Sequence, residues 1–271
     1  MAKSLHISVA AEPLFHLGPL VVSNSMIVSW IVVALFALFA FWYDKQTKKK
    51  NPGRAKIFTD TALEGLYNFF KSIAGEKGAQ FFPLLGTFFL FILLANWLGL
   101  LPGVGTVGMY EETASGQIFI PFFRGATADL NMTLALGLIS VVAAQIYSIK
   151  YLGFKAHVQK YISPNPLNLF IGILELVSEI SRVISFSFRL FGNIFAGEVL
   201  LTVMLSLLPF IAPLPFLLLE IFVGLIQALV FTMLSLVFMS IATTSHGGEN
   251  HTADQEHELA QEVNLATNHS S

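Results

Sequence analysis

Five charged side chains interrupt an apolar stretch near the C-terminal end of the chain, residues 167–208. They are Glu175, Glu179, Arg182, Arg189 and Glu198. The next apolar stretch, residues 214–243, holds one charge, Glu220, and has Gln227 seven residues after it. Ionisable side chains are costly at membrane depth, so each marks a candidate functional site. The carboxyl groups can take up and release protons, whereas a guanidinium keeps its proton at any working pH.

Arg189 is predicted to lie on a small, polar and positive face of its helix. At 100° per residue, Arg182 and Asn193 fall within about 40° of it. Glu175 and Glu179 are about 15–21 Å away along the helix axis, too far to neutralise Arg189. Arg182 is better placed to pair with one of these carboxylates, which is a structural role. An arginine with no reachable partner in its own helix indicates a functional role for Arg189.

A second polar face is predicted between the last two apolar stretches. Glu198 lies about 180° from Arg189 on its helix, and Glu220 and Gln227 lie within about 20° of one line on the next. We expect these three side chains to meet at the outer side of the membrane, with the two carboxyls close enough to share a proton. The structural alternative is that the carboxyls only hold the helices together, with Gln227 as a packing hydrogen bond.

The composition excludes an ordinary soluble enzyme and a disordered chain. Of the 271 residues, 55% are hydrophobic and only 12% are charged, and the mean hydropathy is +0.70. A soluble fold of this size has too little interior to bury so much apolar surface. The chain has no Cys, which excludes disulfides, thiolate chemistry and Cys-ligated metals.

These patterns predict an all-α integral membrane protein with about five membrane-crossing helices. The predicted spans are residues 23–43, 81–101, 131–152, 167–208 and 214–243. Residues 58–77 are predicted to form an amphipathic helix at the membrane surface, and residues 104–130 a loop. The last two spans exceed the bilayer thickness, so they must tilt steeply, as a hairpin joined at Pro209–Pro215. One membrane domain, residues 1–243, is expected to precede a polar acidic tail, residues 244–271.

The basic residues predict the orientation. Eight Lys and Arg residues lie between residues 45 and 77, and three more between residues 150 and 160. If the N-terminus is outside, all eleven face the cytoplasm, and only Lys3 and Arg124 remain outside. Because cytoplasmic loops carry the excess of positive charge, we expect the N-terminus outside and the C-terminal tail in the cytoplasm.

Four sequence blocks resemble a known family. Residues 187–198, SFRLFGNIFAGE, closely resemble the signature of subunit a of F-type ATP synthases. Residues 226–231, IQALVF, resemble the block that follows it, and residues 96–102 and 127–135 resemble two further blocks. The resemblance runs in order over about residues 10–243.

The resemblance implies a stator subunit of the membrane-embedded Fo motor, beside a ring of c subunits and the b subunits of a peripheral stalk. In the family, the arginine matching Arg189 faces the ion-binding carboxylates of the ring. The ion path is lined by the positions that match Asn193, Glu198, Glu220 and Gln227. Glu175 matches an acidic position on the cytoplasmic side of that path. Two half-channels would carry protons, or alternatively Na⁺, to and from the ring and so couple ion flow to rotation and ATP synthesis.

The implied subunit is not an enzyme and needs no cofactor, metal or nucleic acid. It is expected in a bacterial plasma membrane. The His residues of the tail lack compact metal-ligand spacing. A secondary ion-coupled transporter with its own substrate site is the alternative, and a structural scaffold is a weaker one. A transporter would favour internal repeats and broken helices, and neither is visible in the sequence.

Overall fold

The computed structural model describes residues 11–17, 20–49, 53–105, 107–113, 116–161, 166–207 and 213–244. The helices are α1 (Asn24–Thr47), α2 (Arg54–Gly99), the 3₁₀ turn η1 (Ala126–Ala128), α3 (Leu130–Leu152), α4 (Phe154–Tyr161), α5 (Pro166–Leu207) and α6 (Pro213–Ala242). The strands are β1 (Pro13–Leu17), β2 (Leu20–Ser23), β3 (Pro102–Gly105), β4 (Gly108–Thr113) and β5 (Gly116–Pro121). Five helices, α1, α2, α3, α5 and α6, are long and apolar enough to cross a membrane. The all-α membrane fold is therefore confirmed.

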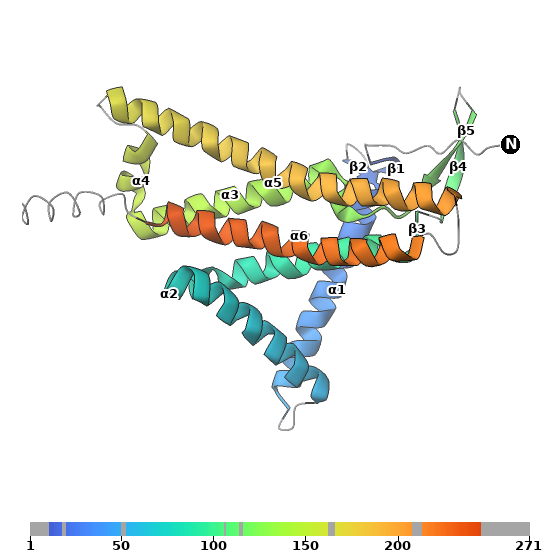
Figure 1. Cartoon of the computed structure of the whole chain (residues 1–271), viewed down its shortest axis with the longest axis horizontal. Helices are drawn as coiled ribbons and strands as arrows, with labels where there is room; N and C mark the ends of the chain where they lie inside the picture. Colours follow the sequence, from blue (N-terminus) through green and yellow to red (C-terminus); the bar gives the residue numbers. More distant parts are fainter. Residues whose placement is uncertain are drawn as a thin grey trace, which may run out of the picture.

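The second half of α2 packs with α3, α5 and α6 along the long axis of the molecule (Figure 1). Phe231 of α6 lies at the centre, with its ring 5.6 Å from that of Phe88 and 5.2 Å from that of Phe186. Lipid is as apolar as these side chains, so the hydrophobic effect does not hold the helices together. Close packing at small residues must stabilise their association instead. Gly137 of α3 illustrates this, because a Cβ there would lie 2.7 Å from Ser187 Oγ on α5.

Helix α2 combines two elements that the sequence predicts separately. The expected surface helix, residues 58–77, and the second span, residues 81–101, correspond to two helices that follow one another across a kink at the non-helical residue Gly75 (Figure 1). Gly75 has φ +58° and ψ −144°, a backbone conformation open to glycine and strained for other residues. The bend changes the direction of the helix between its first half and the half that packs in the bundle.

Two β-hairpins and a short helix were not expected from the sequence. Strands β1 and β2 pair antiparallel, and β4 pairs with β5 inside the predicted 104–130 loop. The segment forms strands because Ile, Phe and Tyr recur between its glycines. The β4–β5 hairpin lies at the end of the bundle where α5 ends and α6 begins, and α4 lies at the opposite end (Figure 1).

The observed spans are close to the predicted ones. Helices α3, α5 and α6 begin and end within one residue of the predicted limits, and α1 extends four residues further than expected. Part of the predicted Pro209–Pro215 turn and almost all of the acidic tail, with its four His residues, lie outside the described residues. The division into one membrane domain and a tail stays a prediction.

Candidate functional site

The candidate residues of α5 and α6 face one another across an antiparallel helix pair. Asn193 Nδ2 donates a hydrogen bond to Gln227 Oε1 at 3.0 Å. Nearer the α5–α6 turn, one helical turn along α5 from Asn193 and two along α6 from Gln227, the carboxyl of Glu220 packs directly on Gly197, where a Cβ would lie 2.1–2.2 Å from its atoms. The polar contacts between the two helices therefore continue from Arg189 toward the turn. The sequence placed Asn193 and Gln227 on separate faces, and the structure joins them.

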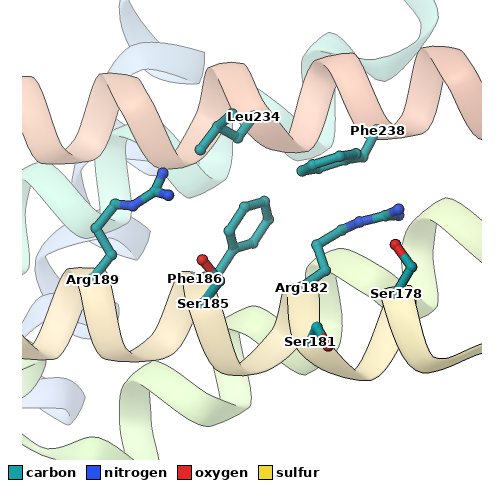
Figure 2. A pocket seen from close by; sticks show the side chains of 8 residues that line it. All are labelled: Ser178, Ser181, Arg182, Ser185, Phe186, Arg189, Leu234 and Phe238. Atoms are coloured by element: carbon teal, nitrogen blue, oxygen red, sulfur yellow. The ribbon is translucent and has the colours of Figure 1, made fainter.

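Arg189 lines an open groove of about 260 Å³ between α5 and α6. Figure 2 shows the guanidinium groups of Arg189 and Arg182 both directed toward α6, with Phe186 between them. The groove is lined by Ser178, Ser181, Arg182, Ser185, Phe186 and Arg189 of α5 and by Leu234 and Phe238 of α6. Short hydroxyl side chains and two guanidiniums make this groove polar and positive, as the sequence predicted for this face.

The two arginines of the groove differ in their contacts. Arg182 stacks on Phe238, with Cζ 3.9 Å from the ring centroid, a cation–π contact. Within the described part of the chain, no ion pair joins Arg182 to Glu175 or Glu179, and Glu179 instead accepts a hydrogen bond from Tyr161. Arg189 is exposed and makes no hydrogen bond or ion pair with any residue that the structure describes. The groove thus holds one arginine fixed by an aromatic ring and one available to a partner outside the chain.

Glu220 is buried without a polar partner among the described residues. It is 6% exposed, and its carboxyl is held against the backbone of α5 at Gly197. One turn along α6, Gly224 lets Asn96 of α2 approach, and Asn96 Nδ2 donates to the Gly224 carbonyl at 2.9 Å. Thr127 of η1 donates to Asn96 Oδ1 at 2.8 Å. This buried network fixes the position of α6 along its axis relative to α2 and η1, and therefore fixes the position of Glu220.

Glu198 has a partner that the sequence interpretation missed. Arg124, in the segment before η1, places Nε 3.6 Å from Glu198 Oε2 and is only 5% exposed. No hydrogen bond joins the carboxyls of Glu198 and Glu220 within the described part of the chain, and the sharing of a proton between them stays a prediction. Arg124 was counted as an outer loop charge. The signal that could have found it is a lone arginine in the apolar run before Asp129.

The segment that carries Arg124 is anchored to two helices. Asp129 accepts a hydrogen bond from the Asn131 backbone N–H at 2.9 Å and so caps the start of α3. Ser25 at the start of α1 also donates to the Asp129 carboxylate. Both Ser25 and Asp129 are buried. The anchor explains how a segment between a hairpin and a helix holds a buried arginine against α5.

On the other side of Arg189, α5 carries Glu179 and Glu175. Both are half-buried, and neither lines the groove. Glu179 accepts hydrogen bonds from Tyr161 of α4 and Gln145 of α3. Glu175 is an electrostatic neighbour of Tyr161. Asn193, Gln227, Glu220 and Glu198 thus lie on the turn side of Arg189, and Glu175 lies on the α4 side.

The described residues contain no group of three or more His, Asp or Glu side chains that could hold a metal ion. The polar atoms near Arg189 come from amides, hydroxyls and single carboxylates on different helices. Such an arrangement can pass protons or small ions between side chains and water.

Comparison with known proteins gives a consistent result. The family model described as ATP synthase A chain matches residues 26–240. An ATP synthase subunit a from Moorella thermoacetica is 31% identical over 238 residues, which cover 86% of this chain and 96% of the relative. Another from Desulforamulus reducens is 33% identical over 247 residues, covering 88% and 86%, and one from Geotalea daltonii is 33% identical over 221 residues, covering 80% and 86%. The chain therefore belongs to the ATP synthase subunit a family and is a multi-pass membrane protein.

Proposed function

We propose that this chain is the stator subunit of an Fo motor, where it conducts protons to and from carboxylates on a neighbouring ring of c subunits. The single observation that carries this role is the exposed Arg189, which has no partner among the described residues. A guanidinium at membrane depth is too costly to leave against lipid, so a carboxylate of another subunit is the partner that fits.

Arg189 is proposed to be the barrier between two half-channels. The guanidinium keeps its proton at any working pH, so its positive charge is permanent. A ring carboxyl that reaches it is stabilised in its ionised form and gives up its proton to water on one side. The same fixed charge repels a cation that would cross directly between the half-channels. Ion transfer then requires that the ring turn.

The outer half-channel is proposed to follow the polar contacts on the turn side of Arg189. Glu198 and Arg124 would lie toward the outer end. Glu220 lies against Gly197, and Gln227 bonds to Asn193 closest to Arg189. Gln227 Nε2 is buried and has no hydrogen-bond partner within the described structure, which suits it to hold a water molecule.

The inner half-channel is proposed to leave on the α4 side, past Glu179 and Glu175. The voltage across the membrane supplies about 2.3 kcal/mol per elementary charge per 100 mV to each proton that crosses. The chain would make and break no covalent bond, because ATP chemistry belongs to other subunits. Its partners would be the c ring, the peripheral-stalk b subunits and the lipid bilayer.

The test is Arg189→Ala in the complete ATP synthase, reconstituted into vesicles. We expect the complex to assemble, to lose proton-driven ATP synthesis and to leak protons passively. Arg189→Lys should fail as well, since an ammonium lacks the planar fork and can lose its proton when buried. Normal proton-driven synthesis by Arg189→Ala would refute the barrier role. The matched control is Arg182→Ala, which removes a guanidinium from the same groove and should retain a larger share of synthesis.

A further inference from the structure

Three helices converge on the carboxylate of Glu179. The Tyr161 hydroxyl, at the end of α4, lies 2.5 Å from Glu179 Oε1 and 3.1 Å from Gln145 Oε1. Gln145 of α3 also donates from Nε2 to the same Glu179 oxygen. Nothing in the sequence connected these residues, which come from two spans and from the linker between them.

A second contact fixes α4 independently of Tyr161. His157, one turn earlier on α4, is hydrogen-bonded through Nδ1 to Ser148 Oγ of α3 at 3.0 Å. Its ring also meets the ring of Tyr161 edge-on, with centroids 5.3 Å apart. Because α4 is docked at two points, removal of the Tyr161 hydroxyl alone leaves the helix attached.

The Tyr161 hydroxyl has one proton and two acceptors within reach. Burial, and then the hydrogen bond to Glu179, raise the pKa of Tyr161 well above its usual value, so the group keeps its proton at working pH. When Glu179 is ionised, the hydroxyl can donate to it. When Glu179 is protonated, its new O–H can donate to the Tyr161 oxygen, and the hydroxyl can turn to Gln145 Oε1. The hydroxyl proton of Tyr161, and the proton of Glu179 when it is present, therefore have an acceptor in both protonation states of Glu179.

Glu179 occupies the place that an inner proton-exchange group needs. It lies about 15 Å from Arg189 along α5, on the α4 side. It does not line the groove that holds Arg189. The groups around it are Gln145 of α3, Tyr161 and His157 of α4, and Glu175 and Arg182 of α5, with Arg182 engaged by Phe238.

We infer that Glu179 is a proton-exchange group of the inner half-channel and that Tyr161 is its positioning residue, with Gln145 as the alternative acceptor. The inference rests on the proposed function. In the exchange, a proton released near Arg189 travels through water to the Glu179 carboxylate, forms its O–H bond, and leaves when that bond breaks toward water beyond α4. Tyr161 keeps its own proton throughout, so the step is balanced by one proton taken up and one released.

The test measures proton conduction through the assembled Fo complex in vesicles with the catalytic head removed. The pH is varied separately on the two sides of the membrane. The side to which the catalytic head normally binds is called the head side. Tyr161→Phe should lower conduction about tenfold, as expected for loss of a hydrogen bond to a charged group. The change should appear in the dependence on the head-side pH, while the dependence on the opposite pH stays as in the unaltered complex. Glu179→Gln should also change the dependence of conduction on the head-side pH.

The matched control is Tyr147→Phe on α3. It makes the same chemical change at a tyrosine that packs edge-on against Phe81 at 4.8 Å and has no hydrogen bond through its hydroxyl to a described residue. It should conduct normally. If Tyr161→Phe prevents assembly, Gln145→Met replaces it, because that change removes the alternative acceptor and leaves the His157–Ser148 contact in place.

Two outcomes would overturn the inference. One is normal conduction with an unchanged head-side pH dependence in an assembled Tyr161→Phe or Gln145→Met complex. The other is a change that appears equally in the dependence on both pH values, which indicates a general loss of structure. The Arg189→Ala result separates this inference from the proposed function. If that variant behaves as a barrier mutant and Tyr161→Phe conducts normally, only the role of Tyr161 and Glu179 fails.

Discussion

The contact between Gly197 and Glu220 makes a single added methyl group a test of the outer half-channel. In Gly197→Ala, the new Cβ would lie 2.1–2.2 Å from the Glu220 carboxyl, which is far inside van der Waals contact. The carboxyl has to move by at least about 1.2 Å to reach ordinary contact at 3.4 Å. Gly192→Ala is the matched control, because a Cβ at that position of the same helix has no atom within 4 Å.

The two substitutions should have opposite effects on stability. Alanine in place of glycine favours a helix by about 1 kcal/mol, and this gain is available at both positions. Overpacking at Gly197 costs about 1–3 kcal/mol, so we expect a net loss of up to about 2 kcal/mol there and a small gain at Gly192. The functional effect is larger, since a displacement of about 1 Å in a reacting group can cost about a hundredfold in rate.

The assay is passive proton conduction through Fo in vesicles, with assembly measured on the same samples. Gly197→Ala should assemble and conduct about tenfold to a hundredfold more slowly, while Gly192→Ala conducts normally. Shortening the carboxylate in Gly197→Ala/Glu220→Asp should restore part of the rate, because the shorter side chain relieves the contact. The reasoning is refuted if an assembled Gly197→Ala complex conducts at the normal rate.

Two further predictions concern the outer segment and the orientation. Arg124→Gln removes the counter-charge of Glu198, whose side chain is 40% exposed, and should destabilise the detergent-solubilised complex by up to about 1 kcal/mol, whereas Arg124→Gln/Glu198→Gln should be less destabilised. Thermal denaturation checks this, and a double variant as unstable as the single one contradicts it. Cysteines introduced at Lys48 and at the exposed Val107 should react with impermeant labels from opposite sides of the membrane. Labelling of both from the same side would contradict the predicted orientation.

The sequence predicted those features that depend on spacing along a single helix. Helical periodicity placed Arg182 and Arg189 on one polar face, and both residues do line one groove. The limits of α3, α5 and α6 followed from hydropathy to within one residue. Hydropathy succeeds for spans because a bilayer leaves few alternatives to a helix of about 20 apolar residues.

Contacts between distant segments could not be read from periodicity. Arg124 and Glu198 are 74 residues apart, and no rule of spacing joins a hairpin segment to a membrane helix. The same holds for Tyr161, which the sequence left in a linker and the structure brings to Glu179. A helical wheel gives the direction of a side chain but not the neighbour that meets it. For that reason the sequence placed Gln227 beside Glu198 and Glu220 but did not predict its hydrogen bond to Asn193.

The exposure of α5 argues that the site is complete only in an assembly. Only 17% of the most apolar window of α5 is buried within the chain, against 39% for α6. Large apolar side chains such as Ile180, Ile184 and Phe188 can face lipid without cost, but the exposed guanidinium of Arg189 cannot. The polar groove between α5 and α6 opens beside it. Under the proposed function, we therefore expect a second protein surface to supply a carboxylate at the depth of Arg189, on the exposed face of α5.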